Sequence, residues 1–188
     1  MKGALAYVMG PSGAGKDTLL AAARARLAGE RFAFAHRYIT RAPVPGDEIF
    51  VSLSPEEFAV RRDEGLFAFA WNARGVDYGI GYEIVLWREA GLTVVVSGSR
   101  ADWLGGAPAR AGAVPILIDA RPDTLASRLA ARGREDRTQI AARLARAGNF
   151  SLDVPGLVRV DNDGAPEAAA DALVKALLAI RDGTSAAA

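Results

Sequence analysis

The sequence contains no cysteine and a single histidine. The absence of cysteine excludes disulfides, thiolate zinc sites and cysteine nucleophiles together. No apolar run approaches the roughly 18 residues of a membrane span. The apolar N-terminal stretch meets Gly-Pro-Ser-Gly after only a strand's length, which is too soon for a secretory signal. We therefore expect a soluble, cytoplasmic protein that binds no membrane.

An excess of charge of one sign is also lacking. The 188 residues carry a formal net charge of +1, which provides no bulk field for nonspecific binding to nucleic acid. Any anion site must therefore be a local cluster of basic residues. With 51% hydrophobic and 24% charged residues, the chain has the balance of an ordinary globular protein and the length of one domain, residues 1–188.

Short apolar runs alternate with helical patterns along the chain. Residues 54–58 form a helix start, with Ser54 as N-cap, Pro55 at the first helical position and Glu57 at the third. The alternation of strand-like apolar runs with helical patterns predicts an α/β fold with a mostly parallel sheet and helices on both faces. The segment 40–71 lacks the rhythm and indicates an inserted substrate-binding lobe. The expected strands are 4–9, 66–71, 92–98, 113–120 and 157–161, and the expected helices are 17–29, 80–91, 122–133, 138–148 and 165–180.

The stretch GPSGAGKDT, residues 10–18, nearly matches the phosphate-binding pattern G-x-x-x-x-G-K-[ST]. It follows a predicted strand and opens a predicted helix, which is the context that the motif requires. In such a loop the backbone N–H groups surround the phosphates, and the lysine, here Lys16, reaches the β- and γ-phosphates. The loop predicts nucleotide contacts from Gly10, Pro11, Ser12, Gly13, Ala14, Gly15, Lys16, Asp17 and Thr18.

Position 17 departs from the pattern, because Asp17 stands where a magnesium-binding hydroxyl is expected and Thr18 follows one residue later. A carboxylate next to a triphosphate is repelled unless a cation lies between them. Asp17 is therefore either a Mg²⁺ ligand, directly or through water, or the N-cap of the first helix. Thr18 can supply a hydroxyl in both cases.

Seven arginines lie between Arg121 and Arg146. Arg128 and Arg132 are four residues apart, so they share one helix face and could converge on one anion. Arg143 lies on the next predicted helix. Two helices joined by a basic loop predict a lid, about residues 128–146, that closes over ATP and stabilises the transferring phosphoryl group. The alternative is a solvated basic face.

Several segments together resemble the guanylate-kinase-like P-loop kinases. They are GPSGAGKDTLL, YITRAPVPGDE, FVSLSPEEF, DYGIG, RLAARGRE followed by IAARL, and VDNDG. Within that group the sequence is most similar to the ribose 1,5-bisphosphate phosphokinases of phosphonate catabolism, through YITR, LFAFAWNARGVDYGIGYEI, VVVSGSRA and ARGRED. The resemblance covers nearly the whole chain. It implies a nucleoside-monophosphate-kinase-like fold, ATP and Mg²⁺ as cofactors, and a phosphorylated sugar as acceptor.

Departures from guanylate kinases favour an acceptor without a base. Val44 occupies the position of their second arginine, and Phe69 falls near the position of their guanine-reading glutamate. Ser97 and Ser99 stand where they have strand-end carboxylates. A purine site needs polar groups at the base edges, and missing partners weaken recognition strongly.

The resemblance implies site residues at its motif positions. Arg41 and Tyr78 carry over as acceptor-binding residues, and Asn162 as a nucleotide contact. We add Arg74 and Arg100 as further acceptor-binding residues, with solvated surface charge as the alternative for both. The rival functions are a nucleoside monophosphate kinase, guanylate kinase above all, and a noncatalytic binding module of the same fold.

Overall fold

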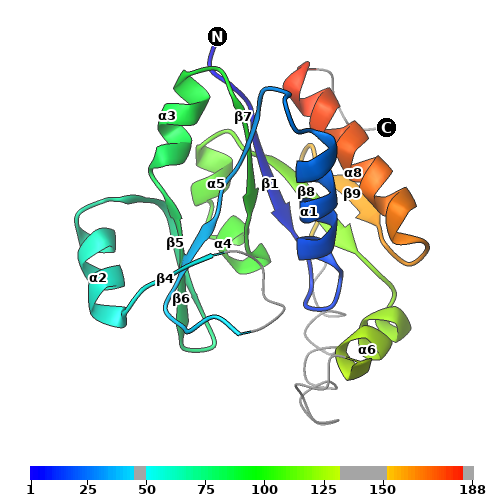
Figure 1. Ribbon diagram of the computed structural model, residues 1–188, viewed down its shortest axis with the longest axis horizontal. Coiled ribbons are helices and arrows are strands. Elements are labelled where there is room, and N and C mark those ends of the chain that lie inside the picture. The colour runs from blue at the N-terminus through cyan, green and yellow to red at the C-terminus, as the bar shows by residue number, and fades with distance from the viewer. Residues whose placement is uncertain (45–49, 132–151, 184–188) are drawn as a thin grey trace. The chain divides into compact units, whose positions relative to one another are not determined.

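The computed structural model describes residues 1–44, 50–131 and 152–183. The chain forms two compact units (Figure 1). One contains residues 1–7 and 28–114, and the other contains residues 8–27 and 115–188. The predicted helix at 138–148 and most of the predicted lid, including Arg132 and Arg143, lie outside the described residues.

Residues 8–27 and 115–188 form the phosphate-loop unit. Its elements are the end of β1 (Leu5–Met9), α1 (Lys16–Arg26), β8 (Val114–Asp119), α6 (Pro122–Ala131), β9 (Val158–Asp161) and α8 (Pro166–Arg181). The strand order here is β1-β8-β9, and β8 pairs with β9 in parallel. Helices α1 and α8 lie side by side (Figure 1).

Residues 1–7 and 28–114 form the second unit, which we call the lobe unit. Its elements after β1 are β2 (Phe32–Phe34), β3 (Arg37–Ile39), β4 (Phe50–Ser52), α2 (Pro55–Asp63), β5 (Phe67–Ala73), β6 (Val76–Gly81), α3 (Glu83–Glu89), β7 (Thr93–Ser97), α4 (Arg100–Leu104) and α5 (Ala107–Arg110). The strand order in this unit is β2-β7-β1, and β2 pairs with β7 in parallel. A second sheet has the order β4-β3-β6-β5, with β6 antiparallel to both β3 and β5.

The predicted α/β class is confirmed, and its main elements follow from burial and capping. Every residue of β1 is buried, which explains its unbroken apolar run. Helix α2 begins as predicted, because the Ser54 hydroxyl accepts the N–H of Glu57 at 3.1 Å and Pro55 stands at the first helical position.

One local prediction is wrong, and one of the two alternatives for Asp17 is excluded. Residues 80 and 81 end β6 instead of starting a helix, and α3 begins only at Glu83. The N-cap of α1 is Gly15, with no side-chain cap, so Asp17 does not cap that helix. Asp17 lies inside the first turn, where its negative charge is favourable next to the helix N-terminus. Within the described ranges, no helix combines the length and apolar character needed to cross a membrane.

Candidate active site

The phosphate loop connects β1 to α1, and its glycines meet two different constraints. Gly13 and Gly15 have φ angles of 92° and 83°, in the left-handed region that glycine adopts without strain. Gly10 is constrained by space, because a Cβ there would lie 2.3 Å from the carbonyl oxygen of Ile118. Only glycine therefore lets the loop lie this close to the end of β8.

A distant asparagine holds the loop in shape. Asn162, only 3% exposed, donates from Nδ2 to the carbonyl oxygen of Ala14 at 2.7 Å. Its own N–H donates to the carbonyl oxygen of Asp119 at 2.9 Å, which fixes it to the end of β8. Within the loop, the N–H of Ala14 donates to the carbonyl of buried Pro11, and Ser12 is exposed. The predicted contact of Asn162 with the nucleotide stays a prediction, since its amide nitrogen is engaged by the loop itself.

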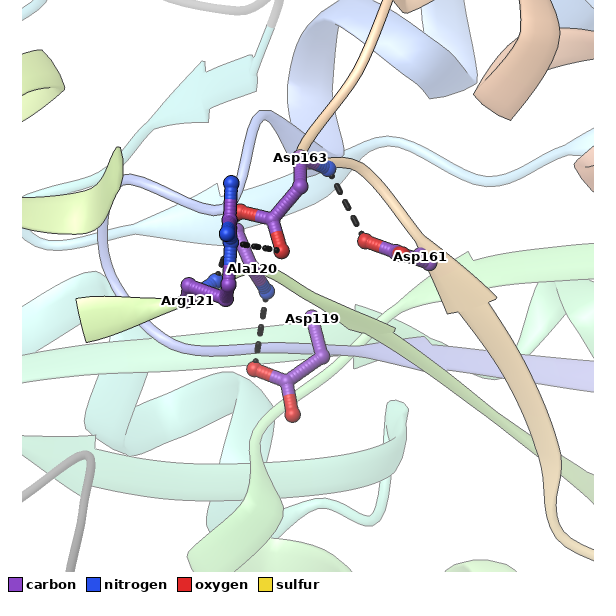
Figure 2. Close-up of polar contacts among 5 residues, drawn as sticks. All are labelled: Asp119, Ala120, Arg121, Asp161 and Asp163. Carbon is purple, nitrogen blue, oxygen red and sulfur yellow. Dashed lines mark hydrogen bonds and ion pairs between the residues drawn. The ribbon is translucent and has the colours of Figure 1, made fainter. Parts of the chain in front are cut away.

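Carboxylates at the ends of β8 and β9 are used to shape the neighbouring turns (Figure 2). Asp163 accepts from the N–H of Arg121 at 2.8 Å and from its Nε at 3.1 Å, and the N–H of Asp163 donates to Asp161 at 2.9 Å. Asp119 accepts the N–H of the residue that follows it. Among the residues that the structure describes, no three acidic or histidine side chains are grouped as metal ligands.

Lys16 and Asp17 form an ion pair at the start of α1. Lys16 Nζ lies 2.8 Å from Asp17 Oδ1, with the lysine side chain 12% exposed and the aspartate side chain 48% exposed. Thr18 is exposed in the same turn. The turn therefore presents an ammonium, a carboxylate and a hydroxyl next to the glycine loop.

Arg128 on α6 faces the phosphate loop. Its Nη1 lies 3.8 Å from the point that a Cβ on Gly15 would occupy. This nitrogen is buried and has no hydrogen-bond partner among the described residues, and the same holds for Asn162 Oδ1. A buried guanidinium donor without an acceptor is costly, so the position suits an anion that is held by the loop.

The four predicted acceptor-binding residues all lie in the lobe unit, and two of them, Arg41 and Tyr78, belong to or follow the paired strands β3 and β6. The guanidinium of Arg41 stacks over the ring of Phe50 at 4.7 Å, just after β3. Tyr78 lies in β6. Arg74 is exposed at the tip of the β5–β6 hairpin with φ 58°, and Arg100 begins α4.

Sequence reasoning missed a polar cluster around Tyr7. The Tyr7 hydroxyl donates to Asp102 Oδ2 and accepts the N–H of Ser99 at 3.0 Å. Burial, followed by the hydrogen bond to Asp102, raises the pKa of Tyr7 far above its ordinary value. Burial also raises the pKa of Asp102, although the hydrogen bond from Tyr7 opposes that shift. The signal available in the sequence was an acid four residues after the end of the predicted strand 92–98, together with a tyrosine inside the apolar strand 4–9.

Comparison with known proteins decides the family. No family model matches the chain. The chain is 52% identical over 161 residues to the ribose 1,5-bisphosphate phosphokinase PhnN of Desulfomicrobium baculatum, covering 85% of this chain and 86% of the relative. It is 48% identical over 174 residues to PhnN of Burkholderia pseudomallei, covering 92% and 94%. The chain belongs to the ribose 1,5-bisphosphate phosphokinase family.

The predicted resemblance is thereby confirmed, and the chain is a member of a kinase family. Solved structures confirm the guanylate-kinase-like fold of this chain. The guanylate kinase of Anaplasma phagocytophilum superposes with a TM-score of 0.68 at 18% identity, covering 96% of this chain and 87% of that chain. At this level of identity the likeness concerns the fold alone.

In this chain, the positions that we aligned with the guanine-reading glutamate and with the strand-end carboxylates carry no carboxylate. Phe69 is 4% exposed and packs edge-on against Tyr7, with ring centroids 5.8 Å apart. Ser97 is buried, and the Ser99 hydroxyl caps α4 by accepting the N–H of Ala101 at 3.2 Å. The side chain of Phe69 therefore contributes to packing and has no polar group with which to read a base edge.

Proposed function

We propose that the chain transfers the γ-phosphoryl group of ATP to the 1-phosphate of ribose 1,5-bisphosphate. The products are ADP and 5-phospho-α-D-ribose 1-diphosphate, and the reaction is a cytoplasmic step of phosphonate catabolism. Family membership supports the reaction. The observation that carries the donor site is the buried Nη1 of Arg128, which lies against the phosphate loop next to Gly15 without a hydrogen-bond partner among the described residues.

The chain's own groups fit the donor phosphates. The loop N–H groups and the N-terminus of α1 supply partial positive charge, and Lys16 and Arg128 add two full charges. Asp17 and Thr18 offer the carboxylate and hydroxyl oxygens that Mg²⁺ prefers, so we assign the metal to this turn. When bound, Mg²⁺ neutralises part of the charge on the β- and γ-phosphates.

The chemical step needs little acid–base catalysis, because the attacking atom is already an anionic phosphate oxygen of the acceptor. That oxygen forms a bond to the γ-phosphorus while the bond from the γ-phosphorus to the bridging oxygen breaks, and ADP leaves with that electron pair. Positioning and charge neutralisation therefore dominate. We assign the charge neutralisation to Lys16 and Arg128, together with Arg132 and Arg143.

On the acceptor side we retain Arg41, Tyr78, Arg74 and Arg100 as binding residues. Two phosphates and several hydroxyls require cations and hydrogen-bonding groups, which these side chains provide. The buried, apolar Phe69 supports an acceptor without a purine base.

A coupled assay of ADP formation tests the proposal. The enzyme is offered ATP–Mg²⁺ with either ribose 1,5-bisphosphate or GMP, and phosphorus NMR identifies the product. We expect turnover of ribose 1,5-bisphosphate and formation of a diphosphate at the anomeric position. Robust turnover of GMP alone would establish the guanylate kinase alternative instead. Failure to bind ATP–Mg²⁺ in calorimetry would favour the noncatalytic binding module.

A further inference from the structure

The four-stranded sheet β4-β3-β6-β5 carries Arg37 on one face. This arginine is not among the acceptor-binding residues assigned above. In the antiparallel pairing, Ile39 of β3 and Trp71 of β5 both lie opposite Tyr78 of β6. Arg37 precedes Ile39 by two residues, and side chains two apart on a strand share a face. Arg37, Tyr78 and Trp71 therefore lie on the same face of three adjacent strands.

These three side chains form a continuous stack. The guanidinium carbon of Arg37 lies 5.5 Å from the centroid of the Tyr78 ring. The rings of Tyr78 and Trp71 are 5.5 Å apart and nearly parallel, at 6°. The cation–π attraction holds the Arg37 guanidinium next to the Tyr78 ring. A guanidinium whose position is restricted in this way suits the bidentate binding of a phosphate.

The electrostatic surroundings of Arg37 also favour a role in binding. Its positive charge lowers the pKa of Tyr7, against the larger raising effects of burial and of Asp102. The Arg37 charge therefore acts on the Tyr7 hydroxyl, which donates to Asp102. A cation near a hydroxyl group suits a ligand that combines phosphate with hydroxyl groups.

The opposite face of the same sheet provides a comparison. Arg61 of α2 stacks over Tyr38 at 5.3 Å, and Tyr38 lies between Arg37 and Ile39, so it points to the other face. Arg61 also forms an ion pair with Glu57 at 2.6 Å, four residues earlier on α2. This second stack pairs a helix with the sheet and has the features of a structural contact.

We propose that Arg37 binds a phosphate of the acceptor, held in place by the Arg37–Tyr78–Trp71 stack. The inference rests on the proposed function for the identity of the acceptor, a phosphorylated pentose. It adds a specificity-determining residue to the acceptor side, on the face of β3 that also carries Ile39. We assign this residue to the acceptor and not to the nucleotide donor.

Steady-state kinetics of Arg37→Gln and of the matched control Arg61→Gln test the proposal. For Arg37→Gln we expect the KM for ribose 1,5-bisphosphate to rise by about 10- to 100-fold, the range expected for losing a charge-assisted hydrogen bond. The KM for ATP should stay within about twofold. Arg61→Gln should leave both KM values near those of the wild type, because its stack lies on the other face.

A second variant and a binding measurement keep the test decisive. Arg37→Lys retains the charge but loses the bidentate fork, so its KM for the acceptor should fall between those of the wild type and Arg37→Gln. In calorimetric titrations with ribose 1,5-bisphosphate, the wild type should bind most tightly, Arg37→Lys less tightly and Arg37→Gln most weakly. Equal acceptor KM values for Arg37→Gln and Arg61→Gln would overturn the inference, as would an equal rise in the KM values for ATP and acceptor.

Failure of the proposed function has a different signature. If the wild type does not turn over ribose 1,5-bisphosphate, the proposed function is wrong, whatever the variants do. If the wild type uses ribose 1,5-bisphosphate and Arg37→Gln behaves like the wild type, the reaction stands and only the role of Arg37 is wrong.

Discussion

Replacing Gly15 by alanine should destabilise the protein through two separate costs. The residue has φ 83°, and a side chain in the left-handed region costs about 1–2 kcal/mol. In addition, the new Cβ would lie 2.5 Å from Nδ2 of Asn162, so the asparagine or the loop must shift. Overpacking against the buried Asn162 side chain costs about 1–3 kcal/mol. The expected total loss in free energy of unfolding is therefore about 2–5 kcal/mol.

Gly29 provides the matched control for the backbone cost. Its φ is 85°, nearly that of Gly15, but no atom lies within 4 Å of the position that its Cβ would take. Gly29→Ala should therefore lose only the backbone contribution, about 1–2 kcal/mol. Urea unfolding followed by tryptophan fluorescence, with the slope m compared among variants, gives both free energies. The difference between the two variants is the cost of the contact with Asn162.

A double-mutant cycle with Asn162→Ala isolates that contact. The single change Asn162→Ala removes the hydrogen bond to Ala14 and leaves a buried carbonyl without its donor, at a cost of about 1–3 kcal/mol. In the double variant the short contact disappears, so the combined loss should be smaller than the sum of the two single losses by about 1–3 kcal/mol. Additivity within about 0.5 kcal/mol would refute the reasoning, as would equal losses for Gly15→Ala and Gly29→Ala.

Three further predictions concern the reaction and its pH dependence. Lys16→Ala should lower kcat by at least about 100-fold while thermal unfolding stays cooperative, and an unchanged kcat would contradict the role of Lys16. Asp17→Ser should raise the Mg²⁺ concentration needed for half-maximal activity, and an unchanged requirement would remove Asp17 from the metal site. The pKa of Asp102 is raised by burial, so the native state holds a proton that the unfolded state has released, and stability falls as pH rises from the ordinary carboxyl pKa through the native value. In the wild type the melting temperature should therefore fall over this pH range, and Asp102→Asn should lack that fall. Parallel curves of melting temperature against pH for the wild type and Asp102→Asn would contradict the assignment.

The sequence was sufficient where local pattern and structure agree. The run ending at Met9 is uniformly buried, and the Ser54–Pro55 helix start has the predicted hydrogen bond. Strands β2, β3 and β4 were not predicted, because three residues are too short for a periodic signal. The end of β6 was assigned to a helix because Ile80 fits both periods, and only pairing with β5 selects the strand.

The candidate site shows the same division. The phosphate loop could be predicted because its residues are contiguous and each has a stated chemical role. The contact between Asn162 and Ala14 joins residues 148 positions apart, so no local sequence pattern predicts it. Arg37 was overlooked because its proposed role depends on contact with the ring of Tyr78. That contact exists only because β3 pairs with β6.

The division of the chain between its two units has a consequence for synthesis. All of the lobe unit lies within the first 114 residues, so it can assemble while the rest of the chain is still being made. The phosphate loop emerges among the first residues, yet Asn162, which donates to its Ala14 carbonyl, is added about 150 positions later. Pairings between such distant segments form slowly, because a long loop must close before any contact is gained. The phosphate loop is thus translated early, but the contact that holds its Ala14 carbonyl can form only after residue 162 has been made.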